Sequence, residues 1–285
     1  MQIAVASGKG GTGKTMVATS LALSLAAGQD PVWLLDCDVE APNAHLFLQP
    51  DILQQQAAVI LIPEIQSELC TLCGKCVEVC QFNALAKIGK SILVFDQLCH
   101  GCGSCCWNCQ PGAIREVPKK IGMLESGLTV QNIHFSRGVL SISEPMPTPI
   151  IRQLKKAYLP SQEAIVILDS PPGASCSVVE TLRGADYALL VTEPSPFGLH
   201  DLAQMVGIAG DMRIPAGVIV NRENEAFLPL DEFCKKNHLP VLMHISYNRK
   251  IAEGIARGKT LIEIYPHYAE AFLQLYDQIK PNAKK

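Results

Sequence analysis

A short stretch near the start of the chain has the residue types and spacing of a phosphate-binding loop. Residues 8–15 read GKGGTGKT and fit the pattern GxxxxGK[ST]. Glycines allow the backbone to curl until its N–H groups face phosphate oxygens, and the positive end of the following helix points to the same place. Lys14 would then hold the β- and γ-phosphates of a nucleotide, and Thr15 would bind Mg²⁺. The expected nucleotide-binding residues of the loop are Gly8, Gly10, Gly11, Thr12, Gly13, Lys14 and Thr15.

A second stretch contains eight cysteines in a duplicated spacing. The runs are Cys70-x2-Cys73-x2-Cys76-x3-Cys80 and Cys99-x2-Cys102-x2-Cys105-x3-Cys109. Thiolates suit iron–sulfur clusters, and in this spacing three cysteines hold one [4Fe–4S] cluster while the fourth reaches the other. The pattern predicts two clusters, one on Cys70, Cys73, Cys76 and Cys109 and the other on Cys99, Cys102, Cys105 and Cys80. Structural zinc is the alternative, because zinc sites also use CxxC pairs.

Several residues around these runs depart from the pattern or are surplus to it. Gln81 and Gln110 stand where proline usually follows the fourth cysteine. We interpret Cys106 as a small buried residue rather than a spare ligand, and His100 as a neighbour of a cluster or an exposed residue. The remaining cysteines, Cys37, Cys176 and Cys234, are expected to be core thiols, with redox sensing as the alternative for the first two.

The composition is that of a globular protein. Of 285 residues, 48% are hydrophobic and 18% are charged, and the net charge is −3. A large core is therefore available, and no excess of positive charge favours nucleic acid as a partner. No apolar run reaches the roughly 18 residues of a spanning helix, and the first residues lack the pattern of a signal peptide. We expect a cytoplasmic protein, without stable membrane insertion, whose cysteines do not form disulfides.

Short apolar segments alternate along the chain with helical patterns. The expected strands are apolar on both faces, as in a mainly parallel sheet covered by helices; they span 2–6, 32–36, 58–62, 164–169, 187–192, 216–220 and 241–245. The expected helices span 14–27, 149–158, 178–183, 199–209, 230–237, 249–257 and 268–279. The alternation predicts a doubly wound α/β fold. Segments 128–135 and 139–142, on either side of Ser-Arg-Gly, are expected to form a β-hairpin.

With Lys9 included, the loop KGGTGKT resembles the deviant Walker A motif of the MinD, ParA, Mrp and nitrogenase-iron-protein ATPases. The resemblance implies a SIMIBI-type P-loop domain in which Lys9 reaches across a dimer interface to the partner's nucleotide. A solvated charge or a contact to its own phosphate is the alternative for this lysine. Segment 34–43 resembles the first switch of this family, in which Asp38 orients the attacking water. An aspartate at this position can otherwise serve only as a helix cap.

Two later segments extend the resemblance. Segment 164–169 and the Ser-Pro-Pro-Gly that follows it resemble Walker B and the second switch. This implies that Asp169 holds Mg²⁺ through water and that the Gly173 amide senses the γ-phosphate. Segment 218–222 resembles the family's adenine-recognising segment, with Asn221 bonded to the base; a polar strand end is the alternative. Phosphoryl transfer depends on positioning and charge neutralisation, so the expected catalytic residues are Lys9, Lys14 and Asp38.

The two motifs together predict an ATPase domain interrupted by a second module. The ATPase domain would span 1–63 and 119–285, and residues 64–118 would form an inserted small α+β ferredoxin-like domain with the two clusters. This layout resembles the MinD-superfamily ATPases with an inserted ferredoxin domain. The leading hypothesis is a slow or partner-stimulated ATPase whose nucleotide-driven dimer cycle gates electron transfer to a partner protein. The dimer would be a homodimer or a heterodimer with a paralogous ATPase.

Two other functions stay open. The first is a carrier or maturation factor that loads an Fe–S or other metal cofactor onto a client protein. Mrp-like scaffolds carry a CxxC pair near the C-terminus, and this sequence has none there, which favours electron transfer. The second is a spatial organiser like MinD or ParA. We interpret residues 273–285 as a domain helix with a soluble tail rather than as a membrane-binding helix.

Overall fold

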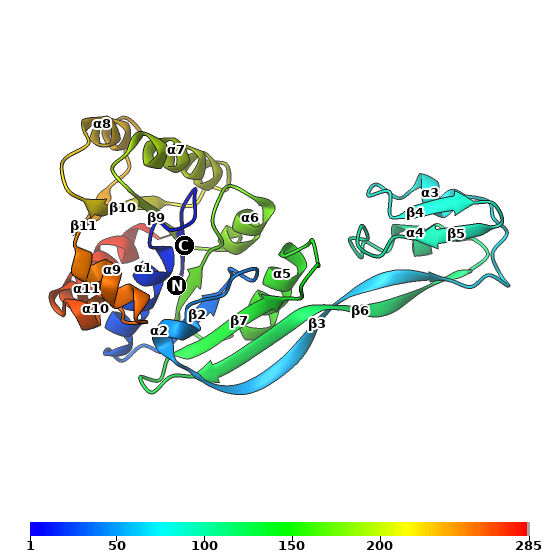
Figure 1. Ribbon diagram of the computed structural model, residues 1–285, viewed down its shortest axis with the longest axis horizontal. Coiled ribbons are helices and arrows are strands. Elements are labelled where there is room, and N and C mark those ends of the chain that lie inside the picture. Colours follow the sequence, from blue (N-terminus) through cyan, green and yellow to red (C-terminus); the bar gives the residue numbers. More distant parts are fainter. Residues whose placement is uncertain (284–285) are drawn as a thin grey trace.

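One sheet of nine strands is the centre of the protein, which the computed structural model describes over residues 1–283. The strand order is β11-β10-β9-β1-β8-β2-β7-β6-β3 (Figure 1). All pairs from β11 to β7 are parallel, whereas β6 and β3 are antiparallel to their neighbours. The mainly parallel α/β sheet predicted from the sequence is confirmed. The parallel strands are β1 (Gln2–Ala6), β2 (Val32–Asp36), β7 (His134–Leu140), β8 (Ile165–Asp169), β9 (Tyr187–Thr192), β10 (Ala216–Glu223) and β11 (Val241–Ser246).

Alternate residues of the central strands are buried on opposite faces of this sheet. On β1, Ile3 and Val5 belong to one hydrophobic core, and Ala4 and Ala6 belong to the other. Helices α1, α10 and α11 cover the first face, while α5, α6, α7 and α8 cover the second. Their bounds are α1 (Lys14–Ala26), α2 (His45–Leu48), α5 (Thr148–Tyr158), α6 (Cys176–Leu182), α7 (Pro196–Asp211), α8 (Leu228–Lys236), α9 (Arg249–Ala256), α10 (Leu261–Ile264) and α11 (His267–Ile279), with a 3₁₀ turn at Lys280–Asn282.

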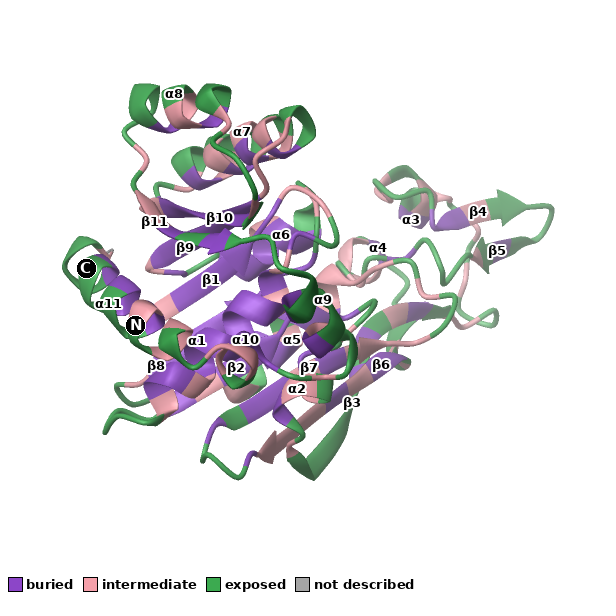
Figure 2. Ribbon diagram, turned by 60° about the vertical axis from the view of Figure 1, so that its left-hand side comes forward, coloured by how far each residue is buried: buried purple, intermediate pink, exposed green. Residues whose placement is uncertain are grey.

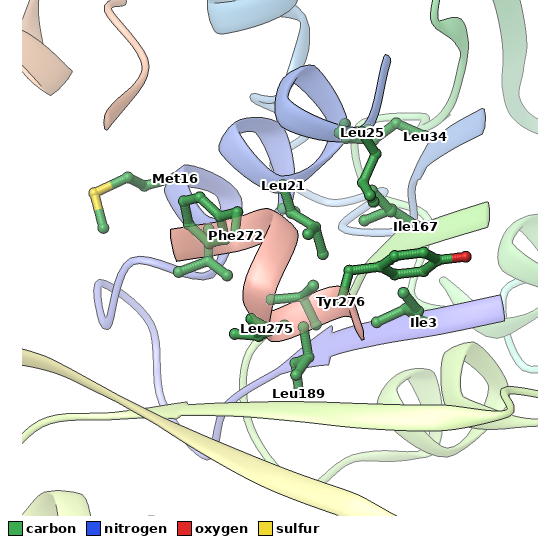
Figure 3. Packing of buried hydrophobic residues seen from close by; sticks show 14 of the residues in the cluster. Ile3, Met16, Leu21, Leu25, Leu34, Ile167, Leu189, Phe272, Leu275 and Tyr276 are labelled. Carbon is green, nitrogen blue, oxygen red and sulfur yellow. The ribbon is translucent and has the colours of Figure 1, made fainter. Parts of the chain in front are cut away.

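Helix α11 packs on the body of the protein as a core element. Phe272, Leu275, Tyr276 and Ile279 are buried against α1 and the sheet, as Figure 3 shows for the first three. The expected domain helix is therefore confirmed, whereas the last two lysines of the expected tail lie outside the described residues. No helix within residues 1–283 combines the length and the hydrophobicity needed to cross a membrane.

Two long strands carry the chain away from the sheet and back. β3 (Asp51–Ile65) and β6 (Ile114–Leu128) pair over almost their whole length as a twisted antiparallel ribbon. Residues 66–113 lie at the far end of this ribbon and are called the cysteine lobe below (Figure 1). The lobe contains α3 (Lys75–Glu78), α4 (Ser104–Trp107) and a hairpin of β4 (Leu85–Ile88) and β5 (Ser91–Val94). Much of β3 and of the lobe is exposed, in contrast with the buried central strands (Figure 2).

The expected hairpin at 128–142 was wrong in its register and its turn. The turn lies at residues 129–133, where the Thr129 N–H donates to the Ile133 carbonyl at 3.0 Å, and β7 pairs with β6 from there. Ser-Arg-Gly, expected as the turn, is inside β7. Gly138 is required there because a Cβ would lie 2.6 Å from Ile150 Cγ2 and 2.7 Å from Val39 Cγ1. The segment 58–62, expected as a buried parallel strand, belongs to the antiparallel edge strand β3.

Candidate functional site

A cavity of about 370 Å³ opens at the carboxyl ends of the parallel strands. This is where ligands bind in doubly wound sheets, because the loops that follow the strands meet there. The phosphate-binding loop, the segments after β2, β8 and β11 and the end of β10 all contribute to it. Of the residues predicted from the sequence, it is lined by Gly10, Gly11, Gly13, Lys14, Thr15, Asp38 and Asn221. Gly8, Lys9, Thr12, Asp169 and Gly173 lie outside its lining.

The phosphate-binding loop is fixed by contacts that glycine alone permits. Gly13 has a φ of 98°, and a Cβ there would lie 2.4 Å from Asn221 Nδ2. A Cβ on Gly8 would lie 2.6 Å from the Asp201 carbonyl oxygen. Within the loop the Thr12 hydroxyl donates to Ser7 Oγ at 2.9 Å, and Ser7 Oγ donates to the Lys9 carbonyl at 2.7 Å. Thr12 is therefore a structural residue of the loop in this structure.

Lys14 faces two acidic side chains across the loop. Its side chain is buried, and its Nζ lies 3.4 Å from the Lys9 carbonyl. Burial lowers the pKa of Lys14, while the charges of Asp169 and Asp38 oppose this effect. The Lys14 ammonium thus interacts with the charges of both aspartates, and a phosphate chain bound at the loop would need its positive charge.

Asp169 has the environment expected of a carboxylate that binds a cation. It ends β8, it is 1% exposed, and neither carboxylate oxygen has a hydrogen-bond partner among the described residues. Burial raises its pKa well above the ordinary value, and the neighbouring Asp36 adds to the rise. Lys14 and the Thr15 hydroxyl act in the opposite direction. A buried unpaired carboxylate is costly, so Mg²⁺ beside Asp169 and Thr15 fits the donor set.

The first switch is held by an aspartate that sequence reasoning had treated only as a strand end. Asp36 is fully buried and accepts hydrogen bonds from the backbone N–H groups of Asp38 at 3.1 Å, Asn43 at 2.9 Å and Ala44 at 3.0 Å. These bonds shape the loop so that Asp38 lines the cavity. Burial raises the pKa of Asp38, and the charge of Lys14 opposes that rise. The available signal was an acidic residue closing a buried strand just before a polar loop.

Lys9 makes an ion pair within its own chain. Its Nζ donates to Glu193 Oε1, and Arg222 Nη1 lies 3.5 Å from the other oxygen of the same carboxylate. The hydrogen bond from Lys9 lowers the pKa of Glu193 despite the opposing effect of burial. Glu193 belongs to the segment that follows β9. A reach of Lys9 to a partner's nucleotide stays a prediction, and it would require this pair to open.

Asn221 and Gly173 both bond to the loop that precedes α1. Asn221 Nδ2 donates to the Thr12 carbonyl at 2.7 Å, and its Oδ1 accepts from the Arg222 N–H at 2.9 Å. Asn221 also lines the cavity, so a contact with a base stays a prediction beside its role in fixing the loop. The Gly173 N–H donates to the Ser7 carbonyl at 3.1 Å, so this bond would have to break before the amide could sense a phosphate.

The part of the cavity farthest from the sequence motifs was not predicted. The end of β11 and the residues after it contribute Ser246, Tyr247 and Asn248 to this part, and one face of α9 contributes Ile251, Ala252 and Ile255. Phe47 of α2 and Met16 of α1 complete the lining. An apolar wall of this kind suits a flat ring such as a nucleobase. The available signal was the position of 246–248 just after a parallel strand, on the same sheet edge as the loop.

In the cysteine lobe, the two predicted sets of four cysteines line two separate cavities. Cys70, Cys73, Cys76 and Cys109 line one, together with Ile65 and Ile114 at the end of the ribbon. The other cavity is lined by Cys80, Cys99, Cys102 and Cys105. In each set the fourth cysteine comes from the other run, which is the grouping that the spacing predicts. Among residues 1–283, no three His, Cys, Asp or Glu side chains are placed to hold a single metal ion.

The two sets have equivalent local contacts, as expected of a duplication. The Ala84 N–H donates to Cys80 Sγ at 3.3 Å, and the Ala113 N–H donates to Cys109 Sγ at 3.3 Å. Burial raises the pKa of Cys105 to about 11. A buried thiol with a raised pKa is a poor surface nucleophile, but a metal displaces its proton.

The surplus residues of the lobe lie apart from these sets or at their margin. Cys106 lines neither cavity, and its Sγ donates to the Ile114 carbonyl at 3.2 Å. His100 lines the second cavity and stacks on Phe82 with ring centroids 3.7 Å apart.

Outside the lobe, the expectation of three core thiols holds for two of the cysteines. Cys37 and Cys234 are buried. Burial raises the pKa of Cys37 to about 12 although Lys155 opposes the rise, which disfavours redox sensing there. Cys176 is exposed at the start of α6, so the expected core position was wrong for this residue.

The sequence matches one family model over most of its length. Residues 3–262 match the CobQ/CobB/MinD/ParA nucleotide-binding domain. The chain belongs to this family. An uncharacterized protein of Methanocaldococcus jannaschii is 29% identical over 98% of this chain and 96% of its own length. A cytosolic Fe–S cluster assembly factor, the NUBP2 homolog of Trichoplax adhaerens, is 23% identical over 98% of this chain and 92% of its own.

Solved structures of the family support the fold. The septum site-determining protein MinD of Pyrococcus horikoshii, complexed with Mg-ADP, superimposes with a TM-score of 0.60 at 18% identity. The alignment covers 98% of this chain and 95% of that one. At this level of identity the likeness concerns the fold, which is that of a P-loop NTPase of the MinD/ParA type.

Proposed function

We propose that the protein is an ATP-hydrolysing iron–sulfur protein in which a nucleotide-driven dimer cycle gates electron transfer from two [4Fe–4S] clusters to a partner protein. One observation carries the proposal: the same chain has a cleft lined by Lys14, Thr15 and Asp38 at the phosphate-binding loop and two cavities, each lined by four cysteines. In terms of domains, residues 1–63 and 119–285 would form the ATPase and residues 64–118 the cluster module. Their boundaries fall within the paired ends of β3 and β6.

In the cleft, this chain's residues would act by position and charge. Lys14 would neutralise the β- and γ-phosphates, and Asp169 with Thr15 would hold the Mg²⁺ that neutralises the developing charge. Asp38 lines the cavity and would orient the attacking water, because its loop is fixed by the three backbone bonds to Asp36. The apolar wall from α9 would receive the adenine ring. Lys9 would leave Glu193 and contact the nucleotide of the partner subunit.

In the lobe, the eight cysteines would hold the two clusters as thiolates. The clusters supply one-electron transfer when they are bound. The chain's own contribution is the order of the ligands and the N–H groups of Ala84 and Ala113, which point at the sulfurs of Cys80 and Cys109. Hydrogen bonds to sulfur raise the reduction potential of such a cluster.

The proposed nucleotide site is tested by separating hydrolysis from cluster content. In Lys14→Ala and Asp38→Asn, ATP hydrolysis should be abolished while iron stays at about eight atoms per chain. Asp211→Asn, on the exposed surface of α7, is the control for the loss of a carboxylate. Hydrolysis at the parental rate in either site variant would contradict the assignment.

The cluster site is tested by iron analysis after anaerobic purification. Cys73→Ser should lower iron from about eight atoms per chain towards four, whereas Cys176→Ser, which changes an exposed cysteine outside the lobe, should leave it unchanged. Zinc in place of iron in the parental protein would exclude the clusters.

The second candidate is an ATP-dependent carrier that delivers an Fe–S or other metal cofactor to a client. The relative from Trichoplax adhaerens, a cytosolic Fe–S cluster assembly factor, favours it. The two functions differ in what leaves the protein. An electron carrier retains its iron when it is incubated with Mg-ATP and an apo-ferredoxin acceptor, whereas a carrier of clusters loses iron to the acceptor. Quantitative iron transfer under these conditions would replace the leading proposal with this one.

A further inference from the structure

One lysine connects the cysteine lobe to the body of the ATPase. Lys119 of β6 places its Nζ 2.9 Å from Glu144 Oε1 and 3.4 Å from Asp96 Oδ2. Glu144 lies in the loop between β7 and α5, and Asp96 lies in the lobe after β5. The Lys119 and Glu144 side chains are only 15% and 14% exposed. Burial alone would lower the pKa of Lys119, but the bond and charge of Glu144 and the charge of Asp96 outweigh it and raise the pKa.

On the body side, the loop with Glu144 leads into α5, and α5 contacts the first switch. Val39, next to Asp38, packs against Gly138 of β7 so closely that a Cβ would lie 2.7 Å from Val39 Cγ1. The same Cβ would lie 2.6 Å from Ile150 of α5. The Leu140 N–H also donates to the Val39 carbonyl at 2.8 Å. A displacement of the first switch therefore acts on β7 and α5 directly, because close-packed cores transmit strain.

The second switch reaches α5 through α6. Helix α6 begins three residues after Gly173, and its last carbonyls are capped by the buried Lys155 of α5. Lys155 Nζ donates to the carbonyls of Glu180 at 3.2 Å, Thr181 at 2.8 Å and Arg183 at 2.5 Å. Arg152 of α5 adds an ion pair with Glu180 at 3.1 Å. Both switches therefore contact α5, directly or through α6, and the loop before α5 contains Glu144.

On the lobe side, Asp96 is one backbone bond from a proposed cluster ligand. The Cys99 N–H donates to the Asp96 carbonyl at 3.3 Å. The cavity of the Cys80, Cys99, Cys102 and Cys105 set also includes Leu61, Pro63 and Glu116 of the ribbon, whereas the other cavity includes Ile65 and Ile114. At about 3.3 Å per residue along a strand, the first of these sets is the one nearer the ATPase body. It is called the proximal set below.

We infer that the Lys119–Glu144 pair is the contact through which the nucleotide state of the cleft changes the environment of the proximal set. When α5 and its loop move with the switches, Glu144 separates from Lys119, and Asp96 alone of the two carboxylates still offsets the lysine charge near the proximal set. A cation stabilises the more negative, reduced form of a cluster, so this separation makes the proximal cluster easier to reduce. Lys119 and Glu144 are positioning residues here, and the inference rests on the proposed function.

The test is a redox titration followed by EPR on the iron-loaded full chain, with and without Mg-ATP. Glu144→Gln removes one of the two carboxylates that offset the Lys119 charge, leaving Asp96, and should raise the midpoint potential of one of the two clusters. Lys119→Gln removes the positive charge and should lower the potential of that same cluster. In both variants the difference between the nucleotide-free and Mg-ATP titrations, present in the parental protein, should be lost, whereas hydrolysis without a partner should continue.

Two matched variants control for charge alone. Lys120→Gln changes the adjacent, exposed lysine, which points to the other face of β6 and makes no ion pair within residues 1–283. Glu163→Gln removes an exposed carboxylate from the turn after α5. Neither should move a midpoint in a nucleotide-dependent way. A second readout is hydrogen exchange of segments 96–104 and 141–147, whose rates should change together on adding Mg-ATP to the parental protein and independently in Glu144→Gln.

The outcomes separate this inference from the proposed function. Unmoved midpoints in both Lys119→Gln and Glu144→Gln would overturn the inference, and so would a nucleotide effect that persists in either. If the inference fails in this way but the parental protein holds about eight irons per chain and hydrolyses ATP, the proposed function stands without the inference. A parental protein without clusters or without hydrolysis would instead refute the proposed function itself.

Discussion

Replacement of Asp36 by asparagine should have a cost that depends on pH in a defined direction. Asp36 is fully buried beneath the first switch and accepts three backbone N–H groups. Burial raises its pKa from the usual 3.8 to about 7, although the Ala44 N–H and the other amide donors oppose the rise and the Asp38 charge adds to it. Ionisation of this side chain therefore disfavours the ligand-free folded state.

The magnitude follows from linkage between proton binding and folding. At about 1.4 kcal/mol per pKa unit, ionised Asp36 costs the folded protein roughly 4 kcal/mol relative to the unfolded chain. A carboxyl group with a raised folded pKa contributes stability that is present below the unfolded pKa and is lost as pH rises through the folded pKa. The window is therefore pH 3.8 to about 7, and roughly 2.5 kcal/mol of the loss falls between pH 5 and 8.

Asp36→Asn resembles the protonated form of the side chain at every pH. At pH 5 the variant should be less stable than the parent, because its amide N–H₂ faces backbone donors. At pH 8 its cost should be smaller by roughly 2.5 kcal/mol, because the parent then contains the ionised carboxylate. Urea melts of both proteins at the two pH values measure this change, with Asp211→Asn as the control for loss of an exposed carboxylate. A cost that is equal at both pH values, or larger at pH 8, would refute the reasoning.

Three further substitutions have expected outcomes. Lys155→Met should lower the free energy of unfolding by about 3 kcal/mol, because three carbonyls at the end of α6 lose their donor. Urea melts measure this loss, with Lys156→Met, at an exposed lysine, as the control. Equal losses in the two variants would contradict the capping role. Phe272→Ala empties a fully buried site and should cost about 3–5 kcal/mol by the same assay. Gly13→Ala should weaken Mg-ADP binding at least about tenfold in calorimetry, because its Cβ would collide with Asn221; unchanged affinity would mean that the loop rearranges freely.

The phosphate-binding loop and the parallel strands could be predicted because their signals are local. A strand such as β8 is apolar on both faces and ends in Asp169, so its type and its functional end are both visible in six residues. The grouping of the eight cysteines was also accessible, since the spacing of the two runs limits which sulfurs can share a cluster. In the structure the two sets line separate cavities, as expected.

The ribbon could not be predicted, because its pairing joins residues far apart in sequence. The first half of β3 contains Gln54, Gln55 and Gln56, a polar run without the alternation that marks a half-buried strand. Its partner β6 contains Pro118, which disfavours a central strand, and Gly127, where a Cβ would collide with the Asp51 backbone. The register of the two strands at such a position depends on the close approach of their backbones. The sequence of one strand alone does not contain this information.

Contacts between distant side chains were missed for the same reason. Lys9 and Glu193 are 184 residues apart, and the local sequence around each residue gives no indication of the other. Lys119 was placed at a domain boundary by its position after the cysteine runs, yet the structure gives it two acidic partners from opposite sides of that boundary. From sequence alone, a charged residue in a polar strand is interpreted as a solvated charge, because its ion-pair partners come from distant segments.

The position of the lobe in the sheet topology explains why the Lys119 contact matters for coupling. An insertion into a parallel strand beside the cleft would disturb the sheet edge on which the phosphate loop and Asp169 depend. The lobe is instead carried by β3 and β6, the last two strands of the sheet, and β7 is the one strand of the body that pairs with them. A two-stranded ribbon alone is a flexible connection, so motion at the switches would be lost along it unless a second contact constrained the lobe. Glu144 approaches the ribbon from the α5 side and, through Lys119, provides that contact. In the inferred mechanism the side-chain contact adds to the covalent connection and to the bonds between Gln153 of α5 and Val59 of β3. The Glu144→Gln titration measures the share of the coupling that depends on the side-chain contact.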